Sequence, residues 1–365
     1  MKKLDQIKIT NYKSIRNLDL ELSDLNVFIG ANGSGKSNFI GAFKFLHYLI
    51  EGNLQTYTAA QGGADIILHF GRKHSESMFF NLSFENGVNG YECRLRASAE
   101  DNFFFQYEAV WYHMKHFYPR PKVVPLGGGH IESTLSQIKT KGGSHIGGYV
   151  LDHLSSWKIY HFHDTSDSAK VKQTGDLADN RFLRPDARNL AAFLYRLEQN
   201  YQDHFDNIQD AIRLVAPFFD RFNLQPLELN PDKIRLEWLE KGSDAYFNAS
   251  VLSDGTLRFI CMATLLLQPQ LPSVILVDEP ELGLHPSAIS VLANLLQSAA
   301  KRTQVLISTQ SVTLVNHFEP QDVVVVEREE GQSVFRRLDR AGMTSWLDEY
   351  GLGDLWEKNV IGGRP

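Results

Sequence analysis

Cysteine, long apolar runs and an excess of positive charge are all scarce in this sequence. Only two cysteines occur in 365 residues, Cys93 and Cys261, so we expect neither a disulfide framework nor a cysteine-based metal cluster. No stretch approaches the roughly 20 apolar residues that a membrane-spanning helix needs, and residues 1–5 lack the apolar run of a signal peptide. We therefore expect a protein of the reducing cytoplasm that has no membrane partner.

The formal net charge of −6 excludes a globally basic nucleic-acid coat. Charge is nevertheless distributed unevenly along the chain. Residues 115–188 contain 11 Lys and Arg against 7 Asp and Glu, whereas residues 198–254 contain 5 against 11. The first block is a candidate nucleic-acid face, and a solvated surface explains it about as well.

The most specific motif is GANGSGKS at residues 30–37, which fits the phosphate-binding pattern G-x-x-x-x-G-K-[ST]. Residues 25–29 before it, mostly apolar, are typical of a short buried strand, and residues 38–46 have the apolar spacing of a helix. A glycine turn could match the pattern by chance, but it would not need this strand and helix. The combination predicts a nucleoside triphosphate site, in which Lys36 bridges the β- and γ-phosphates and the Ser37 hydroxyl binds Mg²⁺.

The rest of the chain alternates between strand and helix patterns. Strands are predicted at residues 3–22 (two strands), 78–111 (three strands of an antiparallel sheet), 157–162, 234–239 and 323–326, the last as the final core strand. Helices are predicted at residues 189–200, 205–215 and 257–267. Residues 119–148, which are rich in Pro, Gly, Lys and Ser, are predicted to form a long loop.

Residues 274–279, VILVDE, form an apolar run that ends in two acids. A buried parallel strand is continuously apolar, and its carboxyl end is where α/β sheets place ligands. Asp278 would therefore hold Mg²⁺, and Glu279 would polarise the attacking water. The alternative is a core strand that ends in solvent-facing acids, and the upstream phosphate motif argues against it.

A third motif, LSDGT at residues 252–256, directly precedes the predicted helix at 257–267. Ser253 and Gly255 at a helix N-terminus would offer an anion a hydroxyl, free N–H groups and the helix dipole. Ser253 would serve as the helix N-cap in either case. The order of the three motifs in one chain favours the anion site.

The order GANGSGKSN, LSDGT, VILVDEPELGLHP and ISTQS resembles the ABC-type ATPase heads of the RecF, SMC and OLD (overcoming lysogenisation defect) group. The opening ITNYKSI resembles their first strand, and the chain is similar to stand-alone bacterial predicted ATPases related to phage-defence proteins. The resemblance implies an α/β P-loop NTPase fold of the ABC-ATPase head type, with a mixed central sheet, an attached antiparallel sheet and a helical lobe. Residues 1–165 and 252–365 would form the nucleotide-binding lobe, and residues 166–251 the helical lobe.

The resemblance also implies a role for each motif residue. Glu279, Lys36 and Gln310 would be catalytic, and Ser37 and Asp278 would bind Mg²⁺. Two ATP molecules would lie between the heads of a homodimer, with residues 281–286 at the position where protomers communicate. The residues implied to contact ATP are Gly30, Asn32, Gly33, Ser34, Gly35, Lys36, Ser37 and Asn38, together with Ser253 and Gly255 from the second protomer.

Two positions depart from the family pattern. The switch position, usually His, is Gln310, which can donate a hydrogen bond but cannot carry a proton, so slow or differently gated turnover is expected. No clear Q-loop is present, and residues 161–164 at a strand exit are the candidate for its place. His161 and His163 could be imagined as metal ligands on one strand face, but no third ligand is evident nearby.

The chain also lacks features of its larger relatives. No second acidic cluster follows residue 327, so a nuclease of the OLD kind would have to act in trans, and no heptads separate Lys36 from Ser253, which excludes an SMC-length coiled coil. Residues 356–365 are expected either to dock on a neighbour or to be disordered.

The leading hypothesis is a cytoplasmic ATPase whose ATP-dependent dimerisation switches a DNA or nuclease partner, in DNA maintenance or phage defence. One alternative is the nucleotide-binding subunit of a membrane transporter, against which ITNYKSI, the missing Q-loop and Gln310 argue. Another is an ATP-binding scaffold that barely hydrolyses ATP. A P-loop small-molecule kinase fits least, because it has no use for LSDGT.

Overall fold

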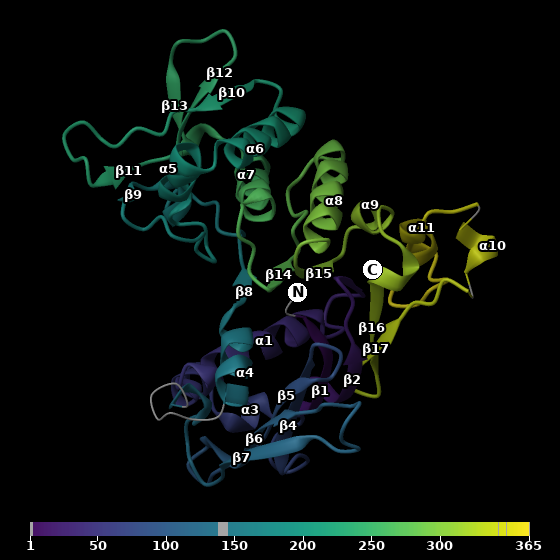
Figure 1. The fold of residues 1–365 in the computed structure, drawn as a ribbon. Helices are drawn as coiled ribbons and strands as arrows, with labels where there is room; N and C mark the ends of the chain where they lie inside the picture. Colours follow the sequence, from purple (N-terminus) through teal and green to yellow (C-terminus); the bar gives the residue numbers. More distant parts are fainter. Residues whose placement is uncertain (1–2, 138–144, 342, 348, 365) are drawn as a thin grey trace.

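Two six-stranded sheets organise the computed structural model, which describes residues 3–137, 145–341, 343–347 and 349–364 (Figure 1). The central sheet has the order β17-β16-β3-β15-β14-β8 and is parallel except for β17, which pairs antiparallel with β16. Its strands are β3 (Leu25–Ile29), β8 (Trp157–Tyr160), β14 (Val274–Asp278), β15 (Gln304–Thr309), β16 (Val323–Glu329) and β17 (Gln332–Arg337).

The second sheet is antiparallel throughout and has the order β2-β1-β4-β5-β6-β7. The predicted strand pair at residues 3–22 and the three predicted strands at residues 78–111 are thus confirmed and joined in one sheet. Its strands are β1 (Leu4–Tyr12), β2 (Ile15–Glu21), β4 (Ser77–Phe84), β5 (Asn89–Ala97), β6 (Phe103–Tyr112) and β7 (Lys122–Gly127).

Helix α1 (Lys36–Ile50) shares one core with the antiparallel sheet and one face of the central sheet. Because successive strand residues point to opposite faces, Phe28 and Leu306 pack into this core, whereas Val27 and Ile307 pack into the core on the other face. The central sheet is therefore covered on both sides. This explains why every residue of β3 and β15 is buried, including the polar residues Asn26, Gln304, Ser308 and Thr309.

Helices and two small antiparallel sheets make up the remaining elements. The helices are α2 (Leu54–Ala60), α3 (Ala64–Ile67), α4 (His145–Ser155), α5 (Leu190–Asn200), α6 (Gln202–Val215), α7 (Asp254–Leu267), α8 (Pro286–Ala300), α9 (Val312–Val315), α10 (Thr344–Leu347) and α11 (Leu352–Glu357). The small sheets are β10 (Phe219–Phe222) with β12 (Glu237–Glu240) and β13 (Tyr246–Asn248), and β9 (Gly175–Asp176) with β11 (Lys233–Ile234).

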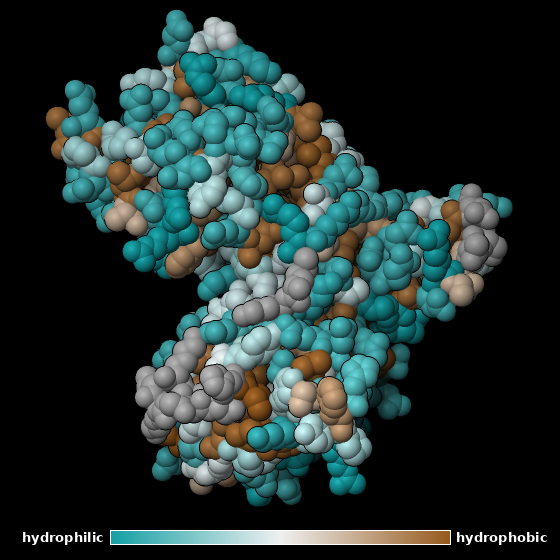
Figure 2. Space-filling model, in the orientation of Figure 1, coloured by the Kyte–Doolittle hydropathy of each residue, from teal (hydrophilic) through white to brown (hydrophobic). Residues whose placement is uncertain are grey.

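The helices α5, α6, α7 and α8 contribute to the core on the second face of the central sheet, and α5, α6 and α7 confirm the helices predicted at residues 189–200, 205–215 and 257–267. Figure 2 shows an upper and a lower body joined through a narrower middle. Most side chains on the surface drawn in that view are hydrophilic. Residues 166–251 contain both small sheets as well as two helices. The division of the chain into lobes remains a prediction. Among the described helices, none has the length and apolarity needed to cross a bilayer.

The predicted loop at residues 119–148 is wrong in part. Strand β7 adds an edge to the antiparallel sheet, and α4 begins at His145, while residues 138–144 lie outside the described part of the chain. Pro125 conceals the strand in the sequence, although an edge strand tolerates proline because one of its sides needs no backbone donor.

Three further strand and terminus predictions need correction. The predicted strand 234–239 divides into β11 and β12, which pair in different sheets. Strand β16 is followed by β17, so residues 323–326 are not the final core strand. Trp356, expected on a neighbour or in a disordered end, is fully buried in the core of its own chain.

Candidate active site

The phosphate motif forms the connection between β3 and α1, at the carboxyl end of the central sheet. Gly35 caps α1 with a φ of 117° in the left-handed region, and a Cβ there would overlap the hydroxyl of Ser333. Only glycine combines this backbone conformation with such a close approach. The glycine of the sequence motif is therefore required at this position for steric reasons.

Two serines from other parts of the chain, one in a turn and one in a strand, support the loop from outside. Ser333 Oγ lies 2.5 Å from the carbonyl oxygen of Ser34 and 2.7 Å from Ser14 Oγ. Asn38, in the first turn of α1, donates from Nδ2 to the same Ser14 hydroxyl at 2.7 Å. The turn between β1 and β2 and the strand β17 are thus tied to the loop, and this fixes its position relative to both sheets.

Lys36 opens α1 and folds back over the loop. Its Nζ donates to the carbonyl oxygens of Gly30 at 2.6 Å and Ala31 at 3.1 Å, and the side chain is buried. Burial lowers the pKa of Lys36, and the carboxylates of Glu279, Asp278 and Glu281 partly offset this effect. The ammonium therefore lies within the field of three acids at the end of β14 and directly after it.

The two acids predicted at the end of β14 face the end of β15. Asp278 Oδ1 accepts a hydrogen bond from the hydroxyl of Ser308, and Glu279 Oε1 accepts one from the amide of Gln310. Glu279 has a φ of 44°, which places its side chain differently from a residue that continues the strand. Its N–H donates to the Ser308 carbonyl oxygen at 2.8 Å, so the residue is held through both backbone and side chain.

Glu281 is a third acid that the sequence did not assign to this cluster. It is 9% exposed, and its Oε1 accepts from the Thr309 hydroxyl at 2.5 Å. Its Oε2 is buried and has no hydrogen-bond partner among the described residues. Burial raises the pKa of Glu281, against the opposing hydrogen bond from Thr309.

The signature residues lie at the start of α7. Ser253 is the N-cap, as predicted, and its Oγ accepts from the backbone N–H of Thr256 at 3.3 Å. A Cβ on Gly255 would overlap the carbonyl oxygen of Gly283, so glycine is needed there because two backbones approach closely. Arg258, one turn further along, donates to the Leu282 carbonyl at 3.0 Å.

Arg258 also reaches the exit of β8. Its Nη2 donates to the carbonyl oxygen of His163 at 2.9 Å, and its Nε donates to that of Phe162 at 3.2 Å. One guanidinium therefore joins the signature helix, the 281–286 segment and the 161–164 segment that was the candidate Q-loop. Among the described residues, no group of three or more His, Cys, Asp or Glu side chains could hold a metal at His161 and His163.

The structure brings part of the predicted site together. Lys36, Asp278, Glu279 and Gln310 converge at the carboxyl ends of β3, β14 and β15. In the described chain, no hydrogen bond or ion pair joins Ser253 or Gly255 to the phosphate loop. The predicted loop residues follow β3 in one continuous segment, and among them Asn32, Gly33 and Ser37 are exposed.

The arrangement fits a nucleoside triphosphate with Mg²⁺. Ser34 Oγ is buried and has no hydrogen-bond partner among the described residues, and the Lys36 ammonium is bound only by backbone carbonyls. A hydroxyl and a carboxylate, from Ser37 and Asp278, are oxygen donors of the kind that Mg²⁺ prefers. The loop N–H groups at the start of α1 suit phosphate oxygens.

Sequence reasoning missed several residues that shape the site. Ser14 and Ser333 contact the loop across the fold, so no local spacing could indicate them. Thr309 and Arg258 lie next to recognised motifs, in ISTQS and after LSDGT. Their adjacency to those motifs was the available signal.

Comparison with known proteins agrees with this geometry. Residues 25–316 match the model of the AAA_21 family, described as "AAA domain, putative AbiEii toxin, Type IV TA system". The chain belongs to this family. The match spans the phosphate loop, the signature, β14 and Gln310, and it stops before β16 and the segment that follows.

Solved SMC head domains share the fold of this AAA_21 chain. An SMC head bound to the C-terminal winged-helix domain of ScpA matches with a TM-score of 0.59 and 14% identity, over 93% of this chain and 99% of the other. An SMC head with an extended coiled coil, bound to the C-terminal domain of ScpA from Pyrococcus furiosus, matches with a TM-score of 0.58 and 15% identity, over 96% and 99% of the two chains. No curated protein matches the chain. The predicted resemblance to ABC/SMC-type ATPase heads and the predicted fold class are confirmed.

Proposed function

We propose that this AAA_21 chain binds and hydrolyses ATP, and that ATP closes two copies of it into a dimer. The observation that carries the proposal is that Lys36, Asp278, Glu279 and Gln310 converge at the carboxyl ends of the strands of the central sheet. The family match and the SMC-head fold support nucleotide binding. The roles of individual residues and the dimer are our inference.

Each residue of the cluster has a task in this proposal. Lys36 exchanges its two carbonyl contacts for phosphate oxygens, and Ser37 and Asp278 hold Mg²⁺, which neutralises charge on the phosphates when bound. Glu279 orients the attacking water and accepts its proton at a carboxylate oxygen. Gln310, which cannot carry that proton, keeps the Glu279 carboxylate in place.

The signature residues support the dimer part of the proposal. Ser253 is exposed at the start of α7. Among the described residues, it makes no hydrogen bond to the phosphate loop of its own chain. A second copy could bring the Ser253 hydroxyl and the first N–H groups of α7 to the nucleotide bound by the first. The close contact of Gly255 with Gly283 would then link the signature to the 281–286 segment.

The decisive experiment is the Glu279→Gln variant in saturating ATP and Mg²⁺. Binding should persist while hydrolysis stops, so light scattering should show a dimer that is absent without ATP. The Lys36→Ala variant is the control and should remain monomeric because it cannot hold the phosphates. A Glu279→Gln chain that binds ATP and stays monomeric would falsify the dimer proposal, and wild-type protein without ATPase activity would contradict hydrolysis.

We also propose that the dimer acts on a nucleic acid or an effector protein in the cytoplasm. The basic block at residues 115–188 supports nucleic acid, and the toxin–antitoxin wording of the family description supports a role in defence. ATPase rates with and without linear double-stranded DNA at low salt test the first partner, since phosphate contacts weaken as salt rises. Stimulation supports DNA, and an unchanged rate directs attention to a protein partner.

A further inference from the structure

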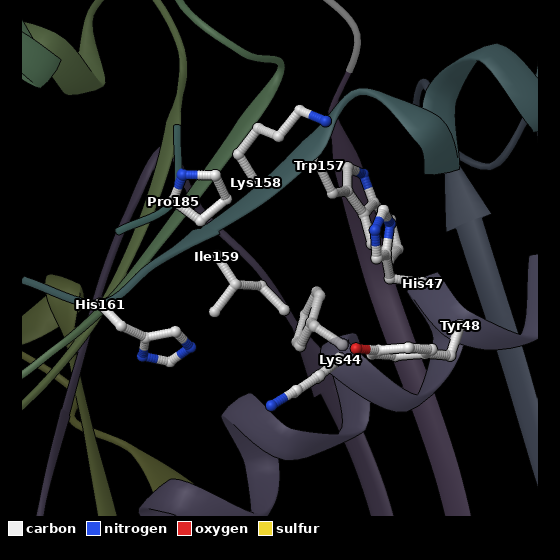
Figure 3. Close-up of a pocket in the computed structure, with 9 residues that line it drawn as sticks. Lys44, His47, Tyr48, Trp157, Lys158, Ile159, His161 and Pro185 are labelled. Atoms are coloured by element: carbon white, nitrogen blue, oxygen red, sulfur yellow. The ribbon is translucent and has the colours of Figure 1, made fainter. Parts of the chain in front are cut away.

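A cavity of about 230 Å³ lies between α1 and β8 and is separate from the phosphate loop (Figure 3). Lys44, which lines it, follows Lys36 by eight residues, or about 12 Å along the helix. Its walls combine cationic and aromatic side chains from the two elements. The lining residues are Phe43, Lys44, His47, Tyr48, Trp157, Lys158, Ile159, His161 and Pro185.

Two lysines line this cavity, and the acids that act on its lining residues are Glu51 at His47 and Asp278 at His161. Lys44 and Lys158 make no ion pair among the described residues, and Lys158 instead lies 5.9 Å from the ring centre of Phe182. The one acid paired with a lining side chain is Glu51, whose Oε1 lies 3.3 Å from His47 Nε2. Figure 3 shows the two ammonium groups pointing to opposite sides of the cavity, and a phosphate within reach of either flexible side chain would meet a lysine that has no ion-pair partner among the described residues, which favours an anionic ligand.

Two ring nitrogens in the walls also lack partners. His47 Nδ1 and Trp157 Nε1 are buried and make no hydrogen bond to any described residue, and Trp157 itself is 3% exposed. Buried polar atoms usually find a partner, so a missing one points to a ligand or water. Trp157 can only donate, which suits an anionic oxygen.

His47 adds a different preference. Partial burial lowers the pKa of His47 despite the neighbouring Glu51, so the ring is neutral near pH 7. With Nε2 lying 3.3 Å from Glu51 Oε1, the carboxylate favours the proton of a neutral ring on Nε2, which leaves Nδ1 as an acceptor. The cavity therefore offers donors for an anion and an acceptor for a hydroxyl or amino group on the same ligand.

We propose that this cavity binds a mononucleotide, with its phosphate at Lys44 and Lys158 and its base against the aromatic wall. Tyr48, which is half-buried, supplies a flat surface that suits a base, and the buried Trp157 contributes its ring nitrogen to the same wall. The volume of about 230 Å³ is below the roughly 300–1,000 Å³ of ordinary ligand pockets, which limits the occupant to about one nucleotide. The phosphate chemistry is shared by a free nucleoside monophosphate and by the 5′-phosphate end of a nucleic acid.

A ligand bound in this cavity would affect the relative position of α1 and β8. The ligand would hold α1, which begins at the phosphate loop, against the exit of β8, where Arg258 binds the backbone of Phe162 and His163. The site is independent of the proposed ATP site, so it can be tested in a chain whose phosphate loop is disabled.

The test is isothermal titration of AMP into the full chain carrying Lys36→Ala. AMP should bind one site per chain, and Lys44→Ala and Lys158→Ala should each weaken it by about tenfold, the loss of one charge-assisted hydrogen bond. Lys301→Ala, at an exposed lysine that follows α8 and does not line the cavity, should change nothing. No AMP binding up to millimolar concentration overturns the proposal, as does unchanged affinity in both cavity variants.

Two further titrations define the ligand. Inorganic phosphate should bind at least tenfold more weakly than AMP, and equal affinity would overturn the role of the aromatic wall. An oligonucleotide with a 5′-phosphate that binds more tightly than AMP, while its 5′-hydroxyl form does not bind, identifies a nucleic-acid end; the reverse order identifies a free nucleotide. Trp157→Phe removes one donor and part of a buried ring, so it should weaken AMP severalfold and also lower the melting temperature of the chain somewhat.

Discussion

The side-chain amide of Gln310 donates a hydrogen bond to the carboxylate of Glu279, across the ends of β15 and β14. Glu279 itself sits at a φ of 44°, and its N–H is bound to the carbonyl oxygen of Ser308. The proposed general base is therefore fixed at its backbone and its side chain. A glutamine at this position orients the base and cannot relay its proton.

Replacing Gln310 with Ala should lower kcat for ATP hydrolysis about tenfold or more, with little change in KM, because the Glu279 carboxylate loses its orientation but the phosphate contacts remain. Steady-state ATPase assays over a range of ATP concentrations provide the measurement. Gln321→Ala, at an exposed site beyond β15, is the control and should match wild type. If kcat is unchanged in Gln310→Ala, the hydrogen bond has no catalytic role.

Glu281→Gln should stabilise the protein at neutral and alkaline pH. Burial raises the pKa of Glu281 above its ordinary value of 4.5, so the folded chain retains a proton that the unfolded chain has already lost. That contribution to stability is full below about pH 4.5 and is lost as pH rises through the folded pKa. Gln keeps the acceptor for Thr309 and escapes this loss.

The expected gain is about 1–2 kcal/mol at pH 8, shrinking towards zero near pH 4, in the free energy of unfolding measured with urea. Glu100→Gln, at an exposed glutamate, controls for the change in net charge. A Glu281→Gln variant less stable than wild type at pH 8 would show that the carboxylate is ionised and held by the neighbouring Lys36.

Gly255→Ala should destabilise the chain by about 1–3 kcal/mol, because the new methyl group would overlap the Gly283 carbonyl oxygen and force the signature helix from the 281–286 segment. Gly148→Ala is the matched control. Gly148 also lies in a helix but has open space where the Cβ would go, so the change should be neutral or stabilising by up to about 1 kcal/mol. Equal effects of the two changes on thermal unfolding would contradict the steric argument.

The parts of this molecule that follow from local chemistry could be predicted from its sequence. The mostly apolar run at residues 25–29 predicts a short buried strand, and the N-cap role of Ser253 follows from its position before an apolar helix. Strand β7 could not be predicted in this way, because Pro125 and the nearby glycines are typical of a loop. The strand tolerates its proline because it lies at the edge of the sheet, and the local sequence does not show that position.

Contacts across the fold were equally hidden in the candidate site. Ser14 and Ser333 lie more than 300 residues apart in the chain, yet their hydroxyls are 2.7 Å apart beside the phosphate loop. Nothing in either local sequence marks such a pair. The motif positions of Lys36, Asp278 and Glu279 were recognisable because phosphate chemistry demands those residue types at a short spacing from a strand.

The segment that follows α11 contacts the outer side of the phosphate loop. Gly363 has a φ of 63°, donates its N–H to Glu327 at 2.9 Å and accepts a hydrogen bond from Trp356 Nε1 at 2.5 Å. A Cβ on Gly363 would lie 2.6 Å from Val325 Cγ1 and 3.5 Å from the Cα of Gly30. A larger residue must therefore push this segment away from β16 and from the first glycine of the loop.

Gly363→Ala should raise KM for ATP severalfold and leave kcat within about twofold, since the loop loses support while the Glu279 cluster is untouched. Gly129→Ala is the matched control, because Gly129 also has a positive φ, 83°, but no atom within 4 Å of the added Cβ. Both changes carry the same backbone strain of about 1–2 kcal/mol, so a rise in KM confined to Gly363→Ala isolates the contact with the loop. An equal rise in both variants would attribute it to strain alone, and the segment after α11 would then have no part in nucleotide binding.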